Sequence, residues 1–426
     1  MDAHSHSRID GSQLANGAKW TMEKSDITVL AWQLAEKEDD ERPEESATPS
    51  PFQVGNRHVR LAYAQQCPDW LYHLGLLVDP QTTPEMFGDV RYVCVSGTAS
   101  RAQELAVCCL QSLQMHMPVG YAMADICGGH ARYALFKAGP VLAVSHGMGN
   151  PSLSIMLHEV LKLLQYARAK RPVTVIRLGT CGGIDVPPGT TIITEKVFNG
   201  LLEHYYEQYV LGRAVRHPAI LDAGLRARLL EVAGQPDMDV PVVAGNTLCA
   251  NDFYEDQARL DGAFCDFDAQ QRLDFLTHCA TAHGIRNIEM ESLCFAAMTH
   301  RAGLRAAVVC VALLNRLTSD KVTGDVEVHF EEWQRRPLRL VARLIAQELA
   351  GVPAAESPPI VAEAQLQALR AAVSSVAVGP AAGGVPGKGQ LVPEAEPVPA
   401  HLDSGHESPV LDPASPARGL SPTRLI

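Results

Sequence analysis

Short apolar segments alternate with helical patterns between residues 56 and 350, and this alternation constrains the fold more than any other feature of the sequence. The apolar run Val141–Ser145 predicts a buried strand, and the Gly-rich turn after it leads into a helical pattern that ends near Ala167. Arg91–Val95 and the helix expected from Arg101 to about Gln114 repeat that order. Strands that alternate with helices form a sheet covered on both faces. The sequence therefore predicts an α/β domain around a mostly buried sheet.

Further elements are predicted by the same patterns. Apolar runs indicate strands, and longer amphipathic patterns indicate helices. The additional strands are expected at Val173–Leu178, Thr190–Glu195, Val242–Ala244 and Ala306–Leu314, and the additional helices at Ile288–His300 and Glu331–Leu349.

The two ends of the chain differ from this middle part in composition. Residues 1–55 are polar, and Glu36–Glu45 contains seven acidic against two basic residues. Residues 351–426 contain twelve of the 28 prolines and no Phe, Trp or Tyr. Such segments bury too little apolar surface to offset the entropy lost on folding. We therefore expect a disordered acidic tail over 1–55, one folded domain over 56–350 and a disordered Pro-rich tail over 351–426.

The overall composition disfavours several classes of protein. The formal net charge of −12 argues against binding to nucleic acid, which usually needs a basic patch. No run of 18 apolar residues predicts a membrane-spanning helix, and residues 1–10 lack the apolar segment of a secretory signal. The eleven cysteines form no Cys-x-x-Cys pair, which fits reduced thiols in a cytoplasmic protein. No cluster has the spacing of a zinc site, so no metal is expected.

Candidate ligand-binding residues follow the strands, because ligands of open α/β sheets bind beyond the carboxyl ends of the strands. After Arg91–Val95, Gly97 and small hydroxyl residues lead to Arg101 at the start of a helix. Backbone N–H groups at a helix N-terminus favour a bound anion. The segment predicts an anion site, or else an ordinary connection between strand and helix.

The strand that begins at Val173 contains Arg177 among apolar residues and ends in Gly179-Thr-Cys-Gly-Gly. A buried arginine needs a partner, because an unpaired buried charge is costly. That partner is either a structural carboxylate or an anionic ligand, which Thr180 and the glycines would allow to approach the backbone. Arg132, in Ala131-Arg132-Tyr133, belongs to no such motif, and on its own it is expected to be a surface residue.

Two further segments carry polar groups that suit a ligand. Glu289 and Glu291 lie two residues apart at the expected start of a helix, so their side chains point in different directions. One carboxylate suits a polyhydroxylated ligand and the other a helix cap, or both only stabilise the first turn. Gln257 and Arg259 offer an amide and a donor fork, which suit a planar heterocycle unless the segment is a solvated loop.

The segments Leu71-Tyr-His-Leu74 and Met86-Phe-Gly-Asp89 resemble the animal-type uridine phosphorylases. Eight other segments together resemble the uridine phosphorylases of the nucleoside phosphorylase family. They are Ser145-His-Gly-Met-Gly, Ser154-Ile-Met-Leu-His-Glu159, Arg177-Leu-Gly-Thr, Gly245-Asn-Thr-Leu-Cys249, Asp252-Phe-Tyr-Glu, Gln257-Ala-Arg-Leu-Asp-Gly262, Ile288-Glu-Met-Glu-Ser292 and Leu313-Leu-Asn-Arg-Leu317, in the family's order and spacing. The resemblance implies a single three-layer catalytic domain with a mixed central sheet flanked by helices. It also implies reversible phosphorolysis of uridine, and of deoxyuridine, to uracil and the pentose 1-phosphate in pyrimidine salvage and catabolism, by a cytoplasmic homodimer with shared active sites.

The resemblance also assigns roles position by position. Phosphate, a co-substrate, would be bound by Gly97, Arg101, Arg177 and Thr180, and Arg132 would reach the phosphate site of the other subunit. Ribose would be held by Met290 and Glu291, with His73 contributed from the neighbouring subunit. The base would be recognised by Gln257 and Arg259 in a pocket formed by Phe253, Leu313 and Val322. Arg177, Glu291, Gln257 and Arg259 would be catalytic, without any cofactor.

Three other interpretations stay open. A purine-directed phosphorylase typically has an Asp at the strand end where this sequence has Asn315, and the presence of Gln257 with Arg259 favours a pyrimidine. A non-catalytic protein that keeps the fold for binding would not need the intact Arg, Glu and Gln set. A nucleoside hydrolase would not need arginines for phosphate. His146 is expected to be a hydrogen-bonded structural residue.

Overall fold

The computed structural model describes residues 54–115, 122–129, 131–169, 172–321 and 324–350. The predicted tails, apart from residues 54 and 55, lie outside the described residues, and so does Val322 of the predicted base pocket.

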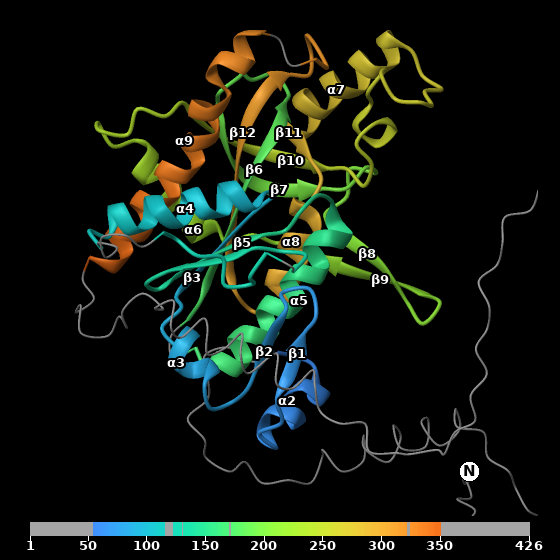
Figure 1. Ribbon diagram of the computed structural model, residues 1–426. Coiled ribbons are helices and arrows are strands. Elements are labelled where there is room, and N and C mark those ends of the chain that lie inside the picture. The colour runs from blue at the N-terminus through green and yellow to red at the C-terminus, as the bar shows by residue number, and fades with distance from the viewer. Residues whose placement is uncertain (1–53, 116–121, 130, 170–171, 322–323, 351–426) are drawn as a thin grey trace, which may run out of the picture. The chain divides into compact units, whose positions relative to one another are not determined.

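An eight-stranded sheet forms the middle layer of the described domain (Figure 1). Its strand order is β11-β10-β7-β12-β6-β3-β5-β4, and β11 also pairs with β6. The β4–β5, β7–β12 and β6–β11 pairs are antiparallel and the others are parallel, so the predicted mixed sheet is confirmed. The strands are β3 (Tyr92–Ser96), β4 (Leu135–Ala138), β5 (Val141–Ser145), β6 (Thr174–Gly183), β7 (Thr191–Phe198), β10 (Val242–Cys249), β11 (Ile285–Glu289) and β12 (Arg305–Asn315).

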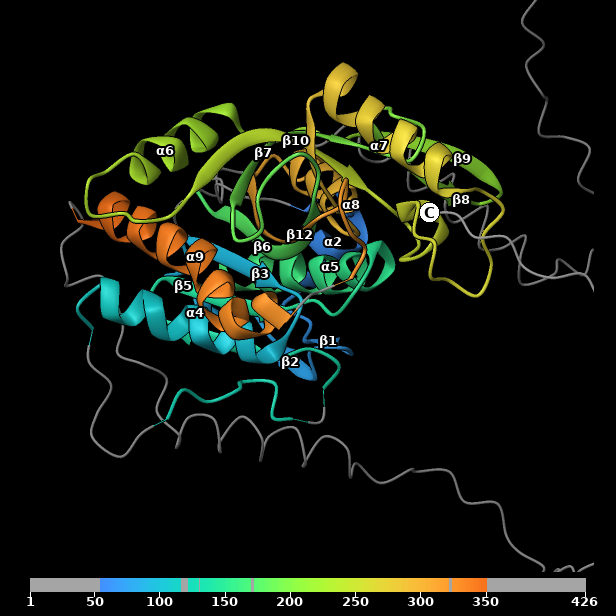
Figure 2. The same ribbon diagram turned by 90° about the horizontal axis from the view of Figure 1, so that it is seen from above.

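Helices cover both faces of this sheet, which confirms the three layers. Successive side chains of a strand point to opposite faces. Val93 and Val95 of β3 accordingly pack in the cluster under α5 and α8, whereas Tyr92 and Cys94 pack in the cluster under α4, α6 and α9. Figure 2 shows α4 and α9 lying side by side on their face. The five helices are α4 (Ala99–Ser112), α5 (Asn150–Ala167), α6 (Ala223–Ala233), α8 (Ser292–Arg301) and α9 (Gly324–Leu349).

Smaller elements lie around these layers. Helix α7 packs its buried Leu276 and Cys279 against the apolar residues of β10 and β11. Strands β8 and β9 form an antiparallel hairpin, and β1 and β2 form another. These elements are α2 (Arg57–Ala64), β1 (Asp69–Leu71), β2 (Leu76–Val78), α3 (Thr83–Phe87), β8 (Tyr205–Val210), β9 (Arg213–Pro218), the short 3₁₀ helix η1 (Glu255–Gln257) and α7 (Ala269–His283).

The helix expected over residues 288–300 is wrong in its first part. Residues up to Glu289 belong to β11, and α8 begins only at Ser292. Asn287 is fully buried, and its side chain accepts a hydrogen bond from the Thr247 hydroxyl at 2.8 Å. A neighbouring strand with a buried hydroxyl therefore holds these residues in the sheet.

Strand β6 is longer than expected, because the glycine run after Leu178 continues the strand instead of ending it. Gly183 pairs with Asn287 of β11 on one side and with Asn315 of β12 on the other. A Cβ atom at Gly183 would lie 2.6 Å from the Val186 side chain. Only glycine fits at this position, so the glycine run serves the close packing of three strands as well as the cavity beside it.

Candidate active site

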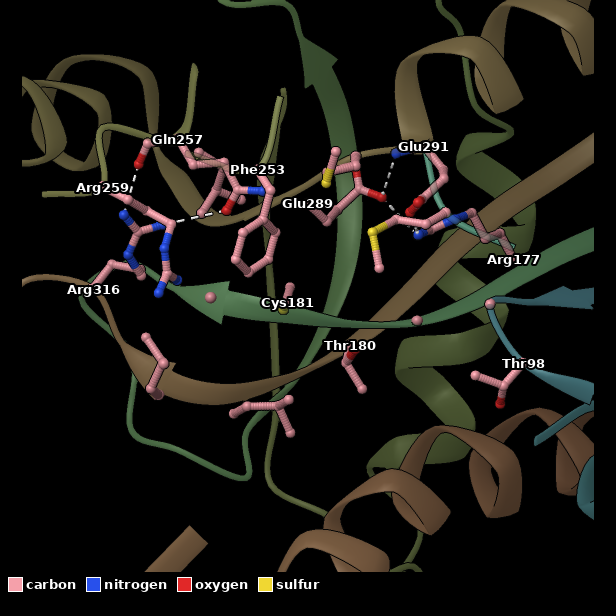
Figure 3. A pocket seen from close by; sticks show the side chains of 18 of the residues that line it. Thr98, Arg177, Thr180, Cys181, Phe253, Gln257, Arg259, Glu289, Glu291 and Arg316 are labelled. Carbon is pink, nitrogen blue, oxygen red and sulfur yellow. Dashed lines mark hydrogen bonds and ion pairs between the residues drawn. The ribbon is translucent and has the colours of Figure 1, made fainter. Parts of the chain in front are cut away.

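A cavity of about 820 Å³ lies at the carboxyl ends of β6, β11 and β12. Figure 3 shows charged side chains gathered at both of its ends, with Phe253 and Cys181 between them. Ten of the predicted site residues line this cavity, although they come from separate parts of the chain. They are Gly97, Arg101, Arg177, Thr180, Phe253, Gln257, Arg259, Met290, Glu291 and Leu313.

One end of the cavity is built around Arg177, which is 2% exposed. Its Nη1 lies 2.8 Å from Oε2 of Glu289, and its Nη2 pairs with Glu291. Burial alone would lower the pKa of Arg177, but the two carboxylates raise that pKa above its ordinary value. The guanidinium is therefore charged. The expected structural carboxylate partner is confirmed, and binding of an anionic ligand by Arg177 stays a prediction.

The two carboxylates beside Arg177 differ in their other contacts. Glu289 accepts hydrogen bonds from the backbone N–H groups of Glu291 and Ser292, both at 3.0 Å, at the start of α8. Glu291 accepts one hydrogen bond from the backbone N–H of Gly149 at 2.6 Å. Glu289 is thus held by the turn it stabilises, whereas Glu291 keeps more of its hydrogen-bonding capacity for a ligand.

The first turn of α4 supplies a second arginine, Arg101, to this end. Thr98 caps α4, and its hydroxyl accepts a hydrogen bond from the Arg101 backbone N–H at 3.3 Å. The Arg101 side chain donates to Oε1 of Gln334 in α9 at 2.7 Å. Burial and the positive charge of Arg177 lower the pKa of Arg101. An anion bound between the two arginines would remove their mutual repulsion.

The other end of the cavity carries Gln257 and Arg259 (Figure 3). Arg259 donates two hydrogen bonds to the Asp261 carboxylate at 2.9 and 2.8 Å, and its guanidinium lies 4.6 Å from the centre of the Phe253 ring. Gln257 is buried, with its backbone carbonyl 2.6 Å from Nη2 of Arg316. This end therefore presents amide and guanidinium groups above an aromatic wall, which suits a planar polar ring.

Arg316 is a residue of this end that the sequence analysis missed. Its side chain is 1% exposed, and it lies 2.6 Å from the Asp320 carboxylate and 3.4 Å from Oε1 of Gln257. The guanidinium thus fixes the position of the glutamine. It follows directly after the apolar strand β12, so the rule that selects residues beyond strand ends would have found it.

His146 also lines the cavity, and its expected role as a hydrogen-bonded structural residue is wrong. The side chain is 1% exposed, yet within the described residues neither ring nitrogen has a hydrogen-bond partner. Burial and the nearby Arg177 charge lower the pKa of His146 to about 3. The imidazole is therefore neutral.

His73 and Arg132 do not line this cavity. His73 Nδ1 lies 2.6 Å from the Glu159 carboxylate, and the His73 side chain is 42% exposed. The backbone N–H of Arg132, an exposed residue, donates to the His73 carbonyl at 3.0 Å. The two residues thus lie next to each other on the surface.

Clusters of metal ligands and membrane-spanning helices are both absent from the part of the chain that the structure describes. In it, no three His, Cys, Asp or Glu side chains come close enough together to hold a metal ion. None of its helices is both long enough and apolar enough to cross a bilayer.

Residues 91–346 match the family model of the phosphorylase superfamily. Uridine phosphorylase 1 of Mus musculus is 45% identical over 281 residues, which span 66% of this chain and 89% of the mouse protein. Uridine phosphorylase 2 of Homo sapiens is 44% identical over 304 residues, which span 70% of this chain and 93% of the human protein. A third relative is the inactive uridine phosphorylase B of Schistosoma mansoni, which is 37% identical over 277 residues. These residues span 65% of this chain and 91% of the relative.

A solved structure supports the same relationship. The crystal structure of uridine phosphorylase from Schistosoma mansoni in complex with thymidine superposes with a TM-score of 0.63 at 36% sequence identity. The superposition covers 70% of this chain and 99% of the Schistosoma chain.

Proposed function

This chain belongs to the phosphorylase superfamily, and from that premise we propose that it is a uridine phosphorylase, a pentosyltransferase of nucleoside metabolism. The reaction is the reversible phosphorolysis of uridine, and of deoxyuridine, to uracil and the pentose 1-phosphate. The observation that carries the proposal is the division of one cavity into an end with two arginines and an end with Gln257 and Arg259. Glu291 lies at the arginine end, where it would meet the sugar.

Phosphate is itself the nucleophile in this reaction. One of its oxygens forms a bond to the anomeric carbon as the bond from that carbon to the uracil nitrogen breaks, and the bonding electrons leave with the base. We assign phosphate binding to Gly97, Arg101, Arg177 and Thr180. Because the arginines hold phosphate against the sugar, much of the entropy cost of bringing the reactants together is met on binding.

Groups at the two ends of the cavity would stabilise the charges that develop in the transition state. Positive charge grows on the sugar ring, where bound phosphate and the Glu291 carboxylate offset it. Negative charge grows on the departing uracil, where donors of Gln257 and Arg259 meet it. A preorganised donor of this kind contributes on the order of 2.7–4 kcal/mol. This chemistry needs no metal-bound water and no organic cofactor.

We further propose a cytoplasmic homodimer in which each subunit completes the site of the other. His73 and Arg132 support this, because they lie together on the surface and outside their own cavity. An imidazole and a guanidinium carried by two adjacent surface residues suit the sugar and phosphate of a ligand bound by a second copy of the chain. Met290, Phe253 and Leu313 line the cavity from the same chain.

A non-catalytic binding protein is the second candidate, because one relative is an inactive phosphorylase. The intact set of Arg177, Glu291, Gln257 and Arg259 around one cavity favours catalysis over this alternative. A purine-directed enzyme is disfavoured by Asn315, whose side chain accepts a hydrogen bond from the Leu317 backbone N–H at 3.1 Å and so belongs to the local turn.

Phosphate-dependent release of uracil tests the proposal. Purified full-length protein is expected to release uracil from uridine only when inorganic phosphate is present, and to leave inosine intact. The free bases released from uridine and from inosine are quantified by liquid chromatography. Nucleoside binding without turnover would favour the non-catalytic candidate, inosine cleavage the purine-directed one, and phosphate-independent release a hydrolase.

Replacing Gln257 is expected to weaken recognition of the nucleoside much more than that of phosphate. Gln257→Ala removes a buried amide from the base end, so the KM for uridine should rise about 10- to 100-fold, which corresponds to the usual effect of one or two lost hydrogen bonds. Steady-state kinetics with each substrate varied in turn provides the measurement. Gln270→Ala, at an exposed position of α7, is the matched control. Equal increases in both KM values would count against a base-binding role.

A further inference from the structure

The imidazole of His146 is buried at the arginine end of the cavity, and its ring nitrogens make no geometrically defined hydrogen bond to any of the described residues. It is 1% exposed, and among the described residues neither Nδ1 nor Nε2 is hydrogen-bonded. Buried polar atoms of proteins are nearly always hydrogen-bonded, and an unpaired one is costly. A partner supplied by the ligand would explain why this residue is kept in such a place.

The backbone on both sides of the ring is fixed, so the imidazole remains directed at the cavity. The His146 backbone N–H donates to the Ser96 carbonyl at 2.8 Å. Its carbonyl accepts a hydrogen bond from the Ser152 hydroxyl at 2.6 Å. Gly147, with φ of +72°, allows the sharp turn that follows.

The neighbours of the ring are the groups that would bind phosphate. A Cβ atom at Gly97 would lie 4.0 Å from Cε1 of His146 and 3.6 Å from Nη1 of Arg101, so these three groups surround one small space. Burial and the positive charges of Arg177 and Arg101 lower the pKa of His146 to about 3, although the Glu291 carboxylate and the Gly147 backbone act in the opposite direction. A neutral imidazole donates one N–H without placing a third cation beside the two arginines.

A second unpaired group points to the same ligand. Nε of Arg177 is buried and, like the His146 nitrogens, has no hydrogen-bond partner in the described part of the chain. Both residues line the cavity. A tetrahedral oxyanion has several acceptor oxygens and a charge opposite to that of the arginines, so one such anion can satisfy both groups.

We propose that His146 binds phosphate directly, donating one ring N–H to a phosphate oxygen beside Arg101 and Arg177. The proposal rests on the proposed phosphorylase function and adds a ligand to its phosphate site. In this role His146 contacts the tetrahedral anion only, so no contact between the imidazole and the base is expected.

Kinetics of two His146 variants test this assignment. H146L fills the space without a donor and should raise the KM for phosphate about tenfold or more, with the KM for uridine within about twofold of wild type. H146Q keeps an N–H donor and should lie between wild type and H146L. Circular dichroism and thermal melting check that both variants fold. An unchanged phosphate KM in folded H146L, or equal changes in both KM values, would overturn the proposal.

A titration of the wild-type protein tests the same contact without a substitution. The ring nitrogens of ¹⁵N-labelled histidine are observed by NMR, and the signal that H146Q lacks identifies His146 among the 16 histidines. Adding inorganic phosphate should move that signal, whereas sodium chloride at the same ionic strength should not. If the chemical shift of the His146 ring nitrogens does not change at saturating phosphate, the contact is refuted. Because the titration needs no turnover, it remains informative even if uracil release shows that the proposed function has failed.

Discussion

Arg177→Ala is expected to abolish phosphorolysis, with a loss in kcat/KM for phosphate on the order of 10³-fold or more. The substitution removes the buried cation of the proposed phosphate site and leaves Glu289 and Glu291 without their shared partner. Removing one partner of a buried ion pair commonly destabilises a protein by about 3–5 kcal/mol. The melting temperature should therefore fall together with the activity, and both are measured on the same preparation.

Arg177→Lys separates these two effects. Lysine keeps the charge between the carboxylates but loses the guanidinium fork, so the fold should survive while phosphate use remains strongly impaired. Arg216→Ala is the matched control, because this arginine pairs with Glu207 on the exposed hairpin and its side chain is 60% exposed. Wild-type activity in Arg177→Lys would show that Arg177 acts only as a structural counter-charge.

Glu291→Gln is expected to lower kcat by about 10²- to 10³-fold, because it removes the negative charge next to the sugar at nearly constant volume. Its effect on the KM for phosphate should be smaller. Pre-steady-state measurement of uracil release distinguishes slowed chemistry from slowed product release.

Glu289→Gln provides the comparison for the loss of a charge beside Arg177. Glu289 serves backbone N–H groups at the start of α8, so its replacement should lower the melting temperature more and kcat less than Glu291→Gln does. Equal losses of kcat in the two variants would mean that Glu291 contributes only through Arg177.

The layered fold was predictable because its signal is local. A buried parallel strand reads as an apolar run, and Val141–Ser145 and Ala306–Leu314 were recognisable for this reason. Strand β11 was not, because Asn287 and Glu289 are polar residues whose partners, Thr247 and Arg177, lie far away in the sequence. A polar residue in a strand pattern predicts an exposed position unless its buried partners are known.

Within the candidate site, the sequence predicted best those residues whose side-chain type and place in the sequence both indicate ligand binding. Arg177 is conspicuous in an apolar strand, and Gln257 and Arg259 stand in a polar segment that the structure brings to the same cavity. His146 was misjudged, since a histidine in a Gly-rich turn gives no sign of whether its ring finds a partner. That information exists only once the folded chain shows which atoms surround it.

The pairing of β6 with three other strands affects the order in which parts of the site unfold on heating. Local opening of β6 would have to break its ladders with β3, β11 and β12 together, whereas Gln257 and Arg259 belong to a short 3₁₀ turn and the irregular chain after it. Segments held by few backbone hydrogen bonds open at lower free energy than core strands. The two ends of the cavity are therefore expected to differ in local stability: on heating, the segment of Gln257 and Arg259 should open first, while Arg177 should keep its place almost until the whole domain unfolds.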